Sequence, residues 1–292
     1  MRCSQCGASN ILEATFCHRC GVALVSPTPR ATLVPLGSLV VSLPYVVVVL
    51  ALFEEVLLNS ALAWYGLALA FLGFVAFPLV GVLLSGRVVE SVRVVFEVCG
   101  LVFAIRIVFS PFPIYFLQSA AFLPIVYSLI MAGVVLYVWF RRIPLKKIGL
   151  SSGLVKMRLQ MLAGIGVGAV LGLVEYPILA PKPIQVGPNV LSNLVYLIVT
   201  MMVFVGLTEE LLFRGLLQSY TAELMPKWEA VHITSLVFAL FHIGWLNPLE
   251  VVFAYGAGVV FGYLLLKTGG LMAPAVAHGF GNIVLYTIAQ SI

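Results

Sequence analysis

The chain has 292 residues, of which 62% are hydrophobic and only 9% are charged. Soluble domains carry about 25% charged residues, so this composition excludes an ordinary soluble protein and predicts an all-α polytopic membrane protein. The formal net charge of +5 is modest and no basic stripe interleaved with aromatic residues accompanies it, so no nucleic-acid partner is expected.

The N-terminus carries two Cys-x-x-Cys-Gly motifs, one with Cys3 and Cys6 and the other with Cys17 and Cys20. Four thiolates at this spacing form the closed tetrahedral site typical of structural Zn²⁺. The pattern therefore predicts a zinc-ribbon module at residues 1–25, with structural zinc as its cofactor. Two disulfides or a redox pair fit less well, because nothing at the N-terminus resembles a signal peptide and no βαβ pattern follows. The segment resembles the short zinc ribbons at the N-termini of many prokaryotic membrane proteins.

A linker with two prolines among small polar residues is expected at 26–32, and nine apolar helices follow it. Eight or nine of them are expected to be transmembrane, because about 20 apolar residues cross a bilayer. The approximate ranges are Leu33–Phe53, Ala61–Leu84, Val92–Phe109, Ala120–Phe140, Met157–Leu179, Val190–Ser219, Ala230–Leu246, Val251–Leu266 and Leu271–Ala289. Arg93 and Glu97 interrupt the third range four residues apart, so they can pair on one helix face.

Positive charge is concentrated in alternate loops, above all in the loop at 141–158. Because basic loops stay in the cytoplasm, we expect the N-terminus to be cytoplasmic and the C-terminus to lie outside. The chain is thus expected to be a multi-pass protein of a prokaryotic cell membrane, with the lipid bilayer as its partner. The same loop separates N-terminal transmembrane helices at 33–140 from a second membrane region at 150–292.

Three smaller features along these helices have structural interpretations. Glycines in the fifth range, among them Gly164, Gly168 and Gly172, predict close helix packing. The pair Glu54-Glu55 has no arginine four residues later, so it is interpreted as a helix end that faces a loop. Glu175 lies near the end of the fifth range without a recognisable partner and is interpreted as interfacial.

Two carboxylates and a guanidinium interrupt the sixth range at Glu209, Glu210 and Arg214. Ionisable groups at membrane depth are costly, so they are kept mostly for function. On a helix Glu210 and Arg214 share a face, while Glu209 points about 100° away. The seventh and ninth ranges carry His242 and His278. At a rise of about 1.5 Å per residue these groups share one band of the membrane, so we expect them to converge.

Three motifs, in this order, resemble a known family, the CAAX-processing and bacteriocin-processing (CPBP or Abi) intramembrane proteases. The motifs are Glu209-Glu210-x-x-x-Arg214, Phe238-x-x-x-His242 and His278-x-x-x-Asn282. The resemblance covers about residues 150–292 and implies that this region is the protease core. It also implies an endopeptidase that cleaves a peptide or membrane-protein substrate within the membrane.

Peptide hydrolysis needs an activated water and a stabilised oxyanion. Glu209 is the candidate general base, with His242 holding the water or sharing its proton. His278 and Asn282 lie one helical turn apart and suit an oxyanion hole. The second carboxylate of the first motif and its arginine have an electrostatic and structural role. The roles that the resemblance implies agree, and a catalytic metal stays open because a Glu-His-His set also binds Zn²⁺.

Two other functions fit parts of the pattern. In a proton-coupled transporter, buried Glu and His residues form a relay, although the repeats and broken helix pairs of many transporters are not visible here. A non-catalytic scaffold would use the ribbon to bind a protein partner. Taken singly, each polar residue also has a structural explanation, such as an ion pair or an interhelical hydrogen bond. The three motifs together favour the protease, and the substrate stays open.

Overall fold

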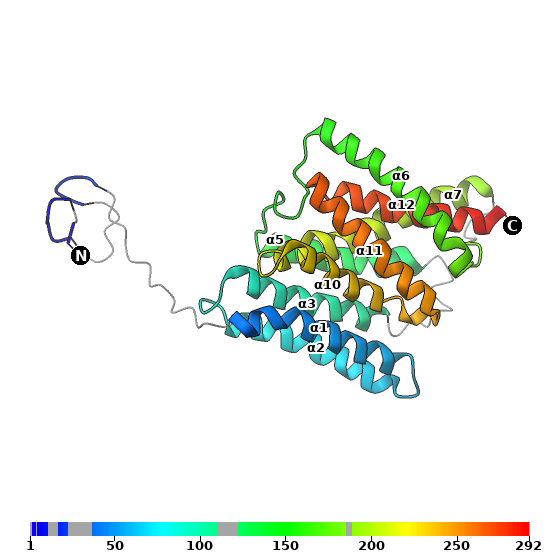
Figure 1. The fold of residues 1–292 in the computed structure, drawn as a ribbon, viewed down its shortest axis with the longest axis horizontal. Helices are drawn as coiled ribbons and strands as arrows, with labels where there is room; N and C mark the ends of the chain where they lie inside the picture. Colours follow the sequence, from blue (N-terminus) through cyan, green and yellow to red (C-terminus); the bar gives the residue numbers. More distant parts are fainter. Residues whose placement is uncertain are drawn as a thin grey trace.

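The computed structural model describes residues 2–3, 5–10, 17–22, 37–109, 122–184 and 189–291. Within these residues the membrane region is entirely helical, and the predicted all-α fold with nine long helices is confirmed (Figure 1). The helices are α1 (Gly37–Leu58), α2 (Ala63–Leu83), α3 (Glu90–Phe109), α5 (Leu123–Phe140), α6 (Leu154–Leu179), the segment Val190–Thr221, α10 (Lys227–Leu240), α11 (Pro248–Thr268) and α12 (Met272–Ser291). The predicted linker at 26–32 lies outside the described residues.

Six of the described helices are long and apolar enough to cross a membrane, namely α2, α5, α6, Val190–Thr221, α11 and α12. Their outer faces carry large apolar side chains, such as Trp64 on α2, which is 81% exposed, and Leu154 and Val155 on α6. Soluble proteins rarely expose apolar patches of this extent, whereas lipid solvates them. The protein is therefore an integral, multi-pass membrane protein.

The predicted range Ala230–Leu246 is wrong at its C-terminal end, because α10 ends at Leu240. A short 3₁₀ turn follows, and α11 then begins with Asn247 as its N-cap and Pro248 in its first turn. Asn and Pro are favoured at these two positions of a helix start. The apolar pattern placed the end of this helix several residues too late. Because α10 ends at Leu240, His242 lies in a turn after α10 and not on the helix.

The segment Val190–Thr221 is one continuous helix that contains two π-helical stretches. Its parts are α7 (Val190–Val199), η2 (Thr200–Leu207), α8 (Thr208–Glu210), η3 (Leu211–Gln218) and α9 (Ser219–Thr221). π-Helical turns are rare and often occur at functional sites. Here they flank the single α-helical turn that carries Glu209 and Glu210, which sets that turn apart from the rest of the segment.

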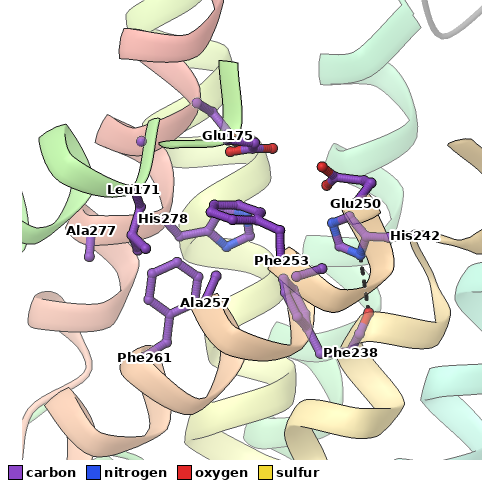
Figure 2. Close-up of a pocket in the computed structure, with 13 residues that line it drawn as sticks. Leu171, Glu175, Phe238, His242, Glu250, Phe253, Ala257, Phe261, Ala277 and His278 are labelled. Atoms are coloured by element: carbon purple, nitrogen blue, oxygen red, sulfur yellow. Dashed lines mark hydrogen bonds between the residues drawn. The ribbon is translucent and has the colours of Figure 1, made fainter. Parts of the chain in front are cut away.

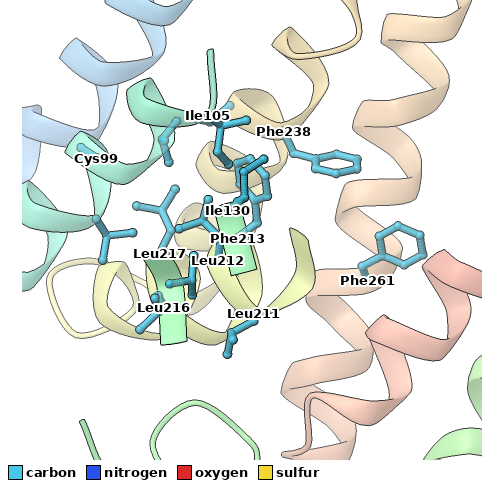
Figure 3. Packing of buried hydrophobic residues seen from close by; sticks show 14 of the residues in the cluster. Cys99, Ile105, Ile130, Leu211, Leu212, Phe213, Leu216, Leu217, Phe238 and Phe261 are labelled. Atoms are coloured by element: carbon cyan, nitrogen blue, oxygen red, sulfur yellow. The ribbon is translucent and has the colours of Figure 1, made fainter. Parts of the chain in front are cut away.

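The η3 stretch is buried on all sides. Figure 3 shows Leu212, Phe213 and Leu217 packed against residues from other helices, with Ile105 of α3 and Ile130 of α5 close by. The ring of Phe213 also contacts those of Phe238 and Phe241. The apolar residues of η3 therefore fix the helix that carries Arg214 within the core.

The predicted close packing through the glycines of α6 is confirmed, and the structure identifies α12 as the partner helix. A Cβ atom on Gly164 would lie 2.7 Å from the carbonyl oxygen of Ala273, and Gly168 and Gly172 are still closer to the α12 backbone. Contacts this short exclude any side chain at these positions. The glycines thus let α12 lie directly against α6, which bears Glu175 near its end.

The other side of α12 packs equally closely on η2. A Cβ atom on Gly206 would lie 2.8 Å from the carbonyl oxygen of Ala275, and one on Gly279 would lie 2.7 Å from that of Met201. These two glycines bring the helix with the paired glutamates against the helix with His278. The approach of the backbones is what places the polar side chains within reach of one another.

The N-terminal helices carry a buried ion cluster that the sequence analysis misread. Glu54 and Glu55 do not face a loop, because α1 continues past them and both are at most 1% exposed. Arg106 of α3 forms an ion pair with Glu55, and its Nε lies 3.8 Å from Glu54 Oε1. The arginine that is missing from the local sequence is thus supplied by another helix.

The predicted pairing of Arg93 with Glu97 is confirmed at 3.2 Å.

Candidate active site

Glu210 and Arg214 form an ion pair that is completely buried. Arg214 Nη1 lies 2.8 Å from Glu210 Oε1, and both residues are 0% exposed. The guanidinium lies over the ring of Phe238 at 4.4 Å and near that of Phe261 at 5.3 Å. Its Nε and Nη2 have no hydrogen-bond partner among the described residues. Among the described residues, Glu210 and the aromatic rings are therefore the main partners of this cation.

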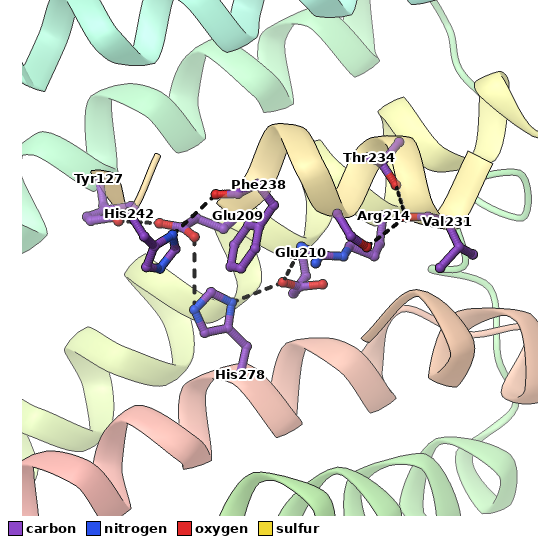
Figure 4. Close-up of polar contacts among 10 residues, drawn as sticks. Tyr127, Glu209, Glu210, Arg214, Val231, Thr234, Phe238, His242 and His278 are labelled. Carbon is purple, nitrogen blue, oxygen red and sulfur yellow. Dashed lines mark hydrogen bonds and ion pairs between the residues drawn. The ribbon is translucent and has the colours of Figure 1, made fainter. Parts of the chain in front are cut away.

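His278 connects the two glutamates (Figure 4). Its Nδ1 lies 3.0 Å from Glu210 Oε1, and its Nε2 lies 3.9 Å from Glu209 Oε2. The ring of Phe261 stacks on the imidazole at 5.3 Å. The structure thus brings together Glu209, Glu210, Arg214 and His278, and Glu210 orients both the arginine and the histidine.

His242 approaches the same group from the turn after α10. Its Nδ1 lies 3.2 Å from the carbonyl oxygen of Phe238, so a proton on Nδ1 leaves Nε2 free to accept a hydrogen bond. The ring of Phe238 lies between the two histidines, 5.0 Å from His242 and 5.7 Å from His278. Phe241, which precedes His242, lies under the guanidinium of Arg106 at 4.9 Å.

Tyr127 of α5 is a residue of this site that the sequence analysis missed. Its hydroxyl donates a hydrogen bond to Glu209 Oε1. A single tyrosine in an apolar helix belongs to no motif, so no sequence pattern indicates its role. The bond fixes one oxygen of Glu209 and leaves the other nearer His278. Glu209 itself is half-buried, unlike the fully buried Glu210.

A cavity of about 30 Å³ lies among α6, α10, α11 and α12 (Figure 2). This volume holds about two water molecules. His242, His278 and Asn282 line it, and so do two glutamates to which the sequence analysis gave no function, Glu175 and Glu250. The interfacial interpretation of Glu175 is wrong, because this residue is only 9% exposed and borders the cavity.

The four N-terminal cysteines converge on one point. The Sγ atoms of Cys3 and Cys20 are 3.6 Å apart, as are those of Cys6 and Cys17, and all four lie within 4.8 Å of one another. A tetrahedral Zn²⁺ with Zn–S bonds of about 2.3 Å needs sulfur atoms about 3.8 Å apart, so the cluster fits. The glycine after each pair has a φ of +70° or +69°, which the tight turn requires.

The backbone of the ribbon also favours thiolates. The backbone N–H of Cys20 donates to the sulfur of Cys17 and lowers the pKa of Cys17 to about 6. A hydrogen bond from the backbone of Cys6 likewise lowers the pKa of Cys3. Burial and the neighbouring thiols instead raise the pKa values of Cys6 and Cys20. Metals bind the thiolate form, so Cys3 and Cys17 are the two thiols best prepared for an ion. Elsewhere in the described part of the chain, no three His, Cys, Asp or Glu ligand atoms are as close together.

The fold and the site together define a multi-pass membrane protein with a hydrolase-like cluster of Glu, His and Arg beside a water-sized cavity. Residues 191–284 match the family described as Type II CAAX prenyl endopeptidase Rce1-like. The match contains all three motifs, so this segment is Rce1-like and the protein is a peptidase. The match covers about a third of the chain, and similarity to this family indicates an intramembrane protease. No curated protein and no solved structure is significantly similar to the chain.

Proposed function

We propose that the protein is an intramembrane endopeptidase in which Glu209 activates a water molecule for attack on a peptide bond. The observation that supports this best is the arrangement around His278. This residue lies 3.9 Å from the carboxylate of Glu209 and at the same time lines the cavity with His242 and Asn282. A base, a second proton acceptor and two oxyanion donors are thereby close to one water-sized space.

Glu209 is the general base of the proposed reaction. Tyr127 occupies Oε1, so Oε2 is the oxygen that takes the proton of the water. His242 holds that water through Nε2, because its Nδ1 points at a backbone carbonyl. The hydroxide attacks the carbonyl carbon of the substrate, and Glu209 then returns the proton to the leaving amine.

The oxyanion is stabilised from α12. Asn282 donates through its side-chain amide, and His278 donates through Nε2 when the ring carries two protons, since Nδ1 is bonded to Glu210. Glu210 and Arg214 do not touch the substrate in this scheme. Their ion pair holds His278 in position and balances the charge of the site.

We also propose the organisation around this core. Residues 1–25 form a ribbon that holds one structural Zn²⁺ and binds a protein partner, and residues 26–32 link it to the helices at 33–140. The protease core lies at 150–292 and takes a peptide or membrane-protein substrate from the bilayer. The basic loop at 141–158 supports a cytoplasmic N-terminus in a prokaryotic cell membrane.

Substrate trapping followed by a cleavage assay tests the proposal. Proteins that co-purify with Glu209→Gln but not with wild type are identified, and their cleavage is measured in proteoliposomes. Gln keeps the volume and hydrogen bonds of Glu but cannot accept the proton, so the rate should fall by ~10²–10⁴ with an unchanged melting temperature. Glu90→Gln, at an exposed position on α3, is the matched control. Cleavage at the wild-type rate by folded Glu209→Gln would refute the mechanism.

A further inference from the structure

Two buried glutamates in the cavity have no cationic partner among the described residues. We call Glu175 of α6 and Glu250 of α11 the cavity glutamates; they are 9% and 1% exposed. Oε2 of Glu250 has no hydrogen-bond partner in the described part of the protein. Figure 2 shows the two carboxylates facing each other across the space next to the ring of His242.

The other buried glutamates discussed above each have a cationic partner, which the cavity glutamates lack among the described residues. Glu210 is paired with Arg214, and Glu54 and Glu55 share Arg106. Each of these cations comes from the chain itself, because an unpaired buried charge is strongly destabilising. The cavity glutamates have no such cation among the described residues, although both line the cavity beside the site.

The fold holds the cavity glutamates near each other. The side chain of Asn247, the N-cap of α11, donates a hydrogen bond to the carbonyl oxygen of Ile178 on α6 at 2.8 Å. This bond ties the beginning of α11 to the end of α6, three residues from each glutamate. Two carboxylates fixed close together favour a cation between them more strongly than either does alone.

We propose that the cavity glutamates bind a primary ammonium group of the substrate, supplied by a lysine side chain. The inference rests on the proposed function, because it assigns the ligand to the peptide that is cut. The cavity is small, about 30 Å³, which favours an ammonium group because it is more compact than the planar guanidinium of arginine. Phe253 and Ala257 supply apolar lining for the methylene groups of the lysine.

The position of the pair makes it a specificity site. The cavity glutamates line the same space as His242, His278 and Asn282, which the proposed mechanism places at the scissile bond. A lysine bound here therefore sits at one fixed position relative to that bond. An uncharged side chain of the same length would leave both carboxylates without a partner, so the site discriminates against it.

A binding measurement tests the ammonium site without proteolysis. The melting temperature of the full-length protein in detergent is recorded with n-butylammonium, n-butylguanidinium and 1-butanol at equal concentration and pH. We expect n-butylammonium alone to raise it, by at least about 2 °C at saturation. Glu209→Gln should keep this response, whereas Glu175→Gln and Glu250→Gln should lose it. An equal shift with 1-butanol, or a shift that survives in both cavity variants, overturns the inference.

The melting temperatures of the ligand-free variants provide a second test of the ammonium site. Removing an uncompensated charge should leave Glu250→Gln melting at or above the wild-type temperature, so the variant remains folded for the assay. A large fall in its melting temperature would mean that Glu250 has an internal partner, and the inference would be wrong. Glu90→Gln, whose site is exposed, should change neither the melting temperature nor the response to n-butylammonium.

A cleavage profile then tests the assignment to the substrate. Mixed N-acetylated peptides are incubated with the reconstituted protein, and the cut sites are read by mass spectrometry. Wild type should favour lysine over norleucine at least ~10-fold at one position, and Glu250→Gln should lose this preference while still cutting norleucine peptides. Cleavage without a lysine preference overturns the inference. If n-butylammonium raises the melting temperature but the protein cuts no peptide, the proposed peptidase function is refuted while the ammonium site is still supported.

Discussion

Replacing Glu210 by Gln should destabilise the protein more than any other single change in the site. Among the described residues Glu210 is the carboxylate that pairs with Arg214, at 2.8 Å, and both side chains are 0% exposed. The neutral amide leaves the guanidinium without a counter-ion among aromatic rings. It also weakens the contact between Glu210 Oε1 and His278 Nδ1, which are 3.0 Å apart in the wild type. Removing one partner of a buried pair costs about 3–5 kcal/mol.

That free energy corresponds to a fall in melting temperature on the order of 10 °C for a chain of this size. The melting temperature of purified protein in detergent measures it directly, with the yield of folded protein as a second reading. A Glu210→Gln/Arg214→Met double variant provides the decisive comparison. Because apolar replacements of a whole buried pair are often neutral, the double variant should recover most of the lost stability. Its peptidase activity should not return, since His278 still lacks its carboxylate.

Two results would refute this reasoning. If Glu210→Gln melts within about 2 °C of wild type, the ion pair does not carry the energy assigned to it. If the double variant melts below the single variant, the guanidinium has a stabilising function apart from Glu210, for example through its contact with Phe238. Either result would also weaken the view that Glu210 is a positioning residue for His278.

Three further predictions concern the rest of the molecule. Asn282→Ala removes one oxyanion donor and should lower the cleavage rate by ~10²–10³ without changing the melting temperature; an unchanged rate would exclude this role. Tyr127→Phe frees Glu209 Oε1 and should lower kcat by ~10-fold while leaving KM unaltered, and a change confined to KM would contradict it. A Cys3→Ser/Cys17→Ser variant should lose the zinc, about one ion per chain in wild type by metal analysis, and full retention would disprove the ribbon site.

The sequence alone predicted the features that depend on regular spacing. The Glu210–Arg214 pair follows from helical geometry, and the close packing of α6 follows from glycines four residues apart, although only the structure identifies α12 as the partner. The nine helices follow from the length of the apolar runs. The cysteine cluster follows from two short turns that each fix a pair of thiolates. Most of these predictions concern residues close together along one element.

The sequence could not predict contacts that depend on how helices rotate and pack. Tyr127 meets Glu209, and Arg106 meets Glu55, only because particular faces of α5 and α3 turn toward their neighbours. Glu250 lies in the first turn of α11 and lines the cavity, which the apolar pattern did not reveal. The π-helical stretches likewise have no pattern of their own. Single polar residues on separate helices acquire their meaning from tertiary structure.

Arg106 and Tyr127 have a consequence for how this protein can be divided. The matched segment, residues 191–284, begins well after both of them. Yet Arg106 covers the residue that precedes His242, and Tyr127 holds the carboxylate of Glu209. A truncated protein that starts at residue 150 would retain all three protease motifs but lose Arg106 and Tyr127. The boundary that is visible in the sequence is therefore not a boundary of the working unit, and grafting the C-terminal helices onto another membrane anchor should give an inactive protein unless α3 and α5 are carried with them.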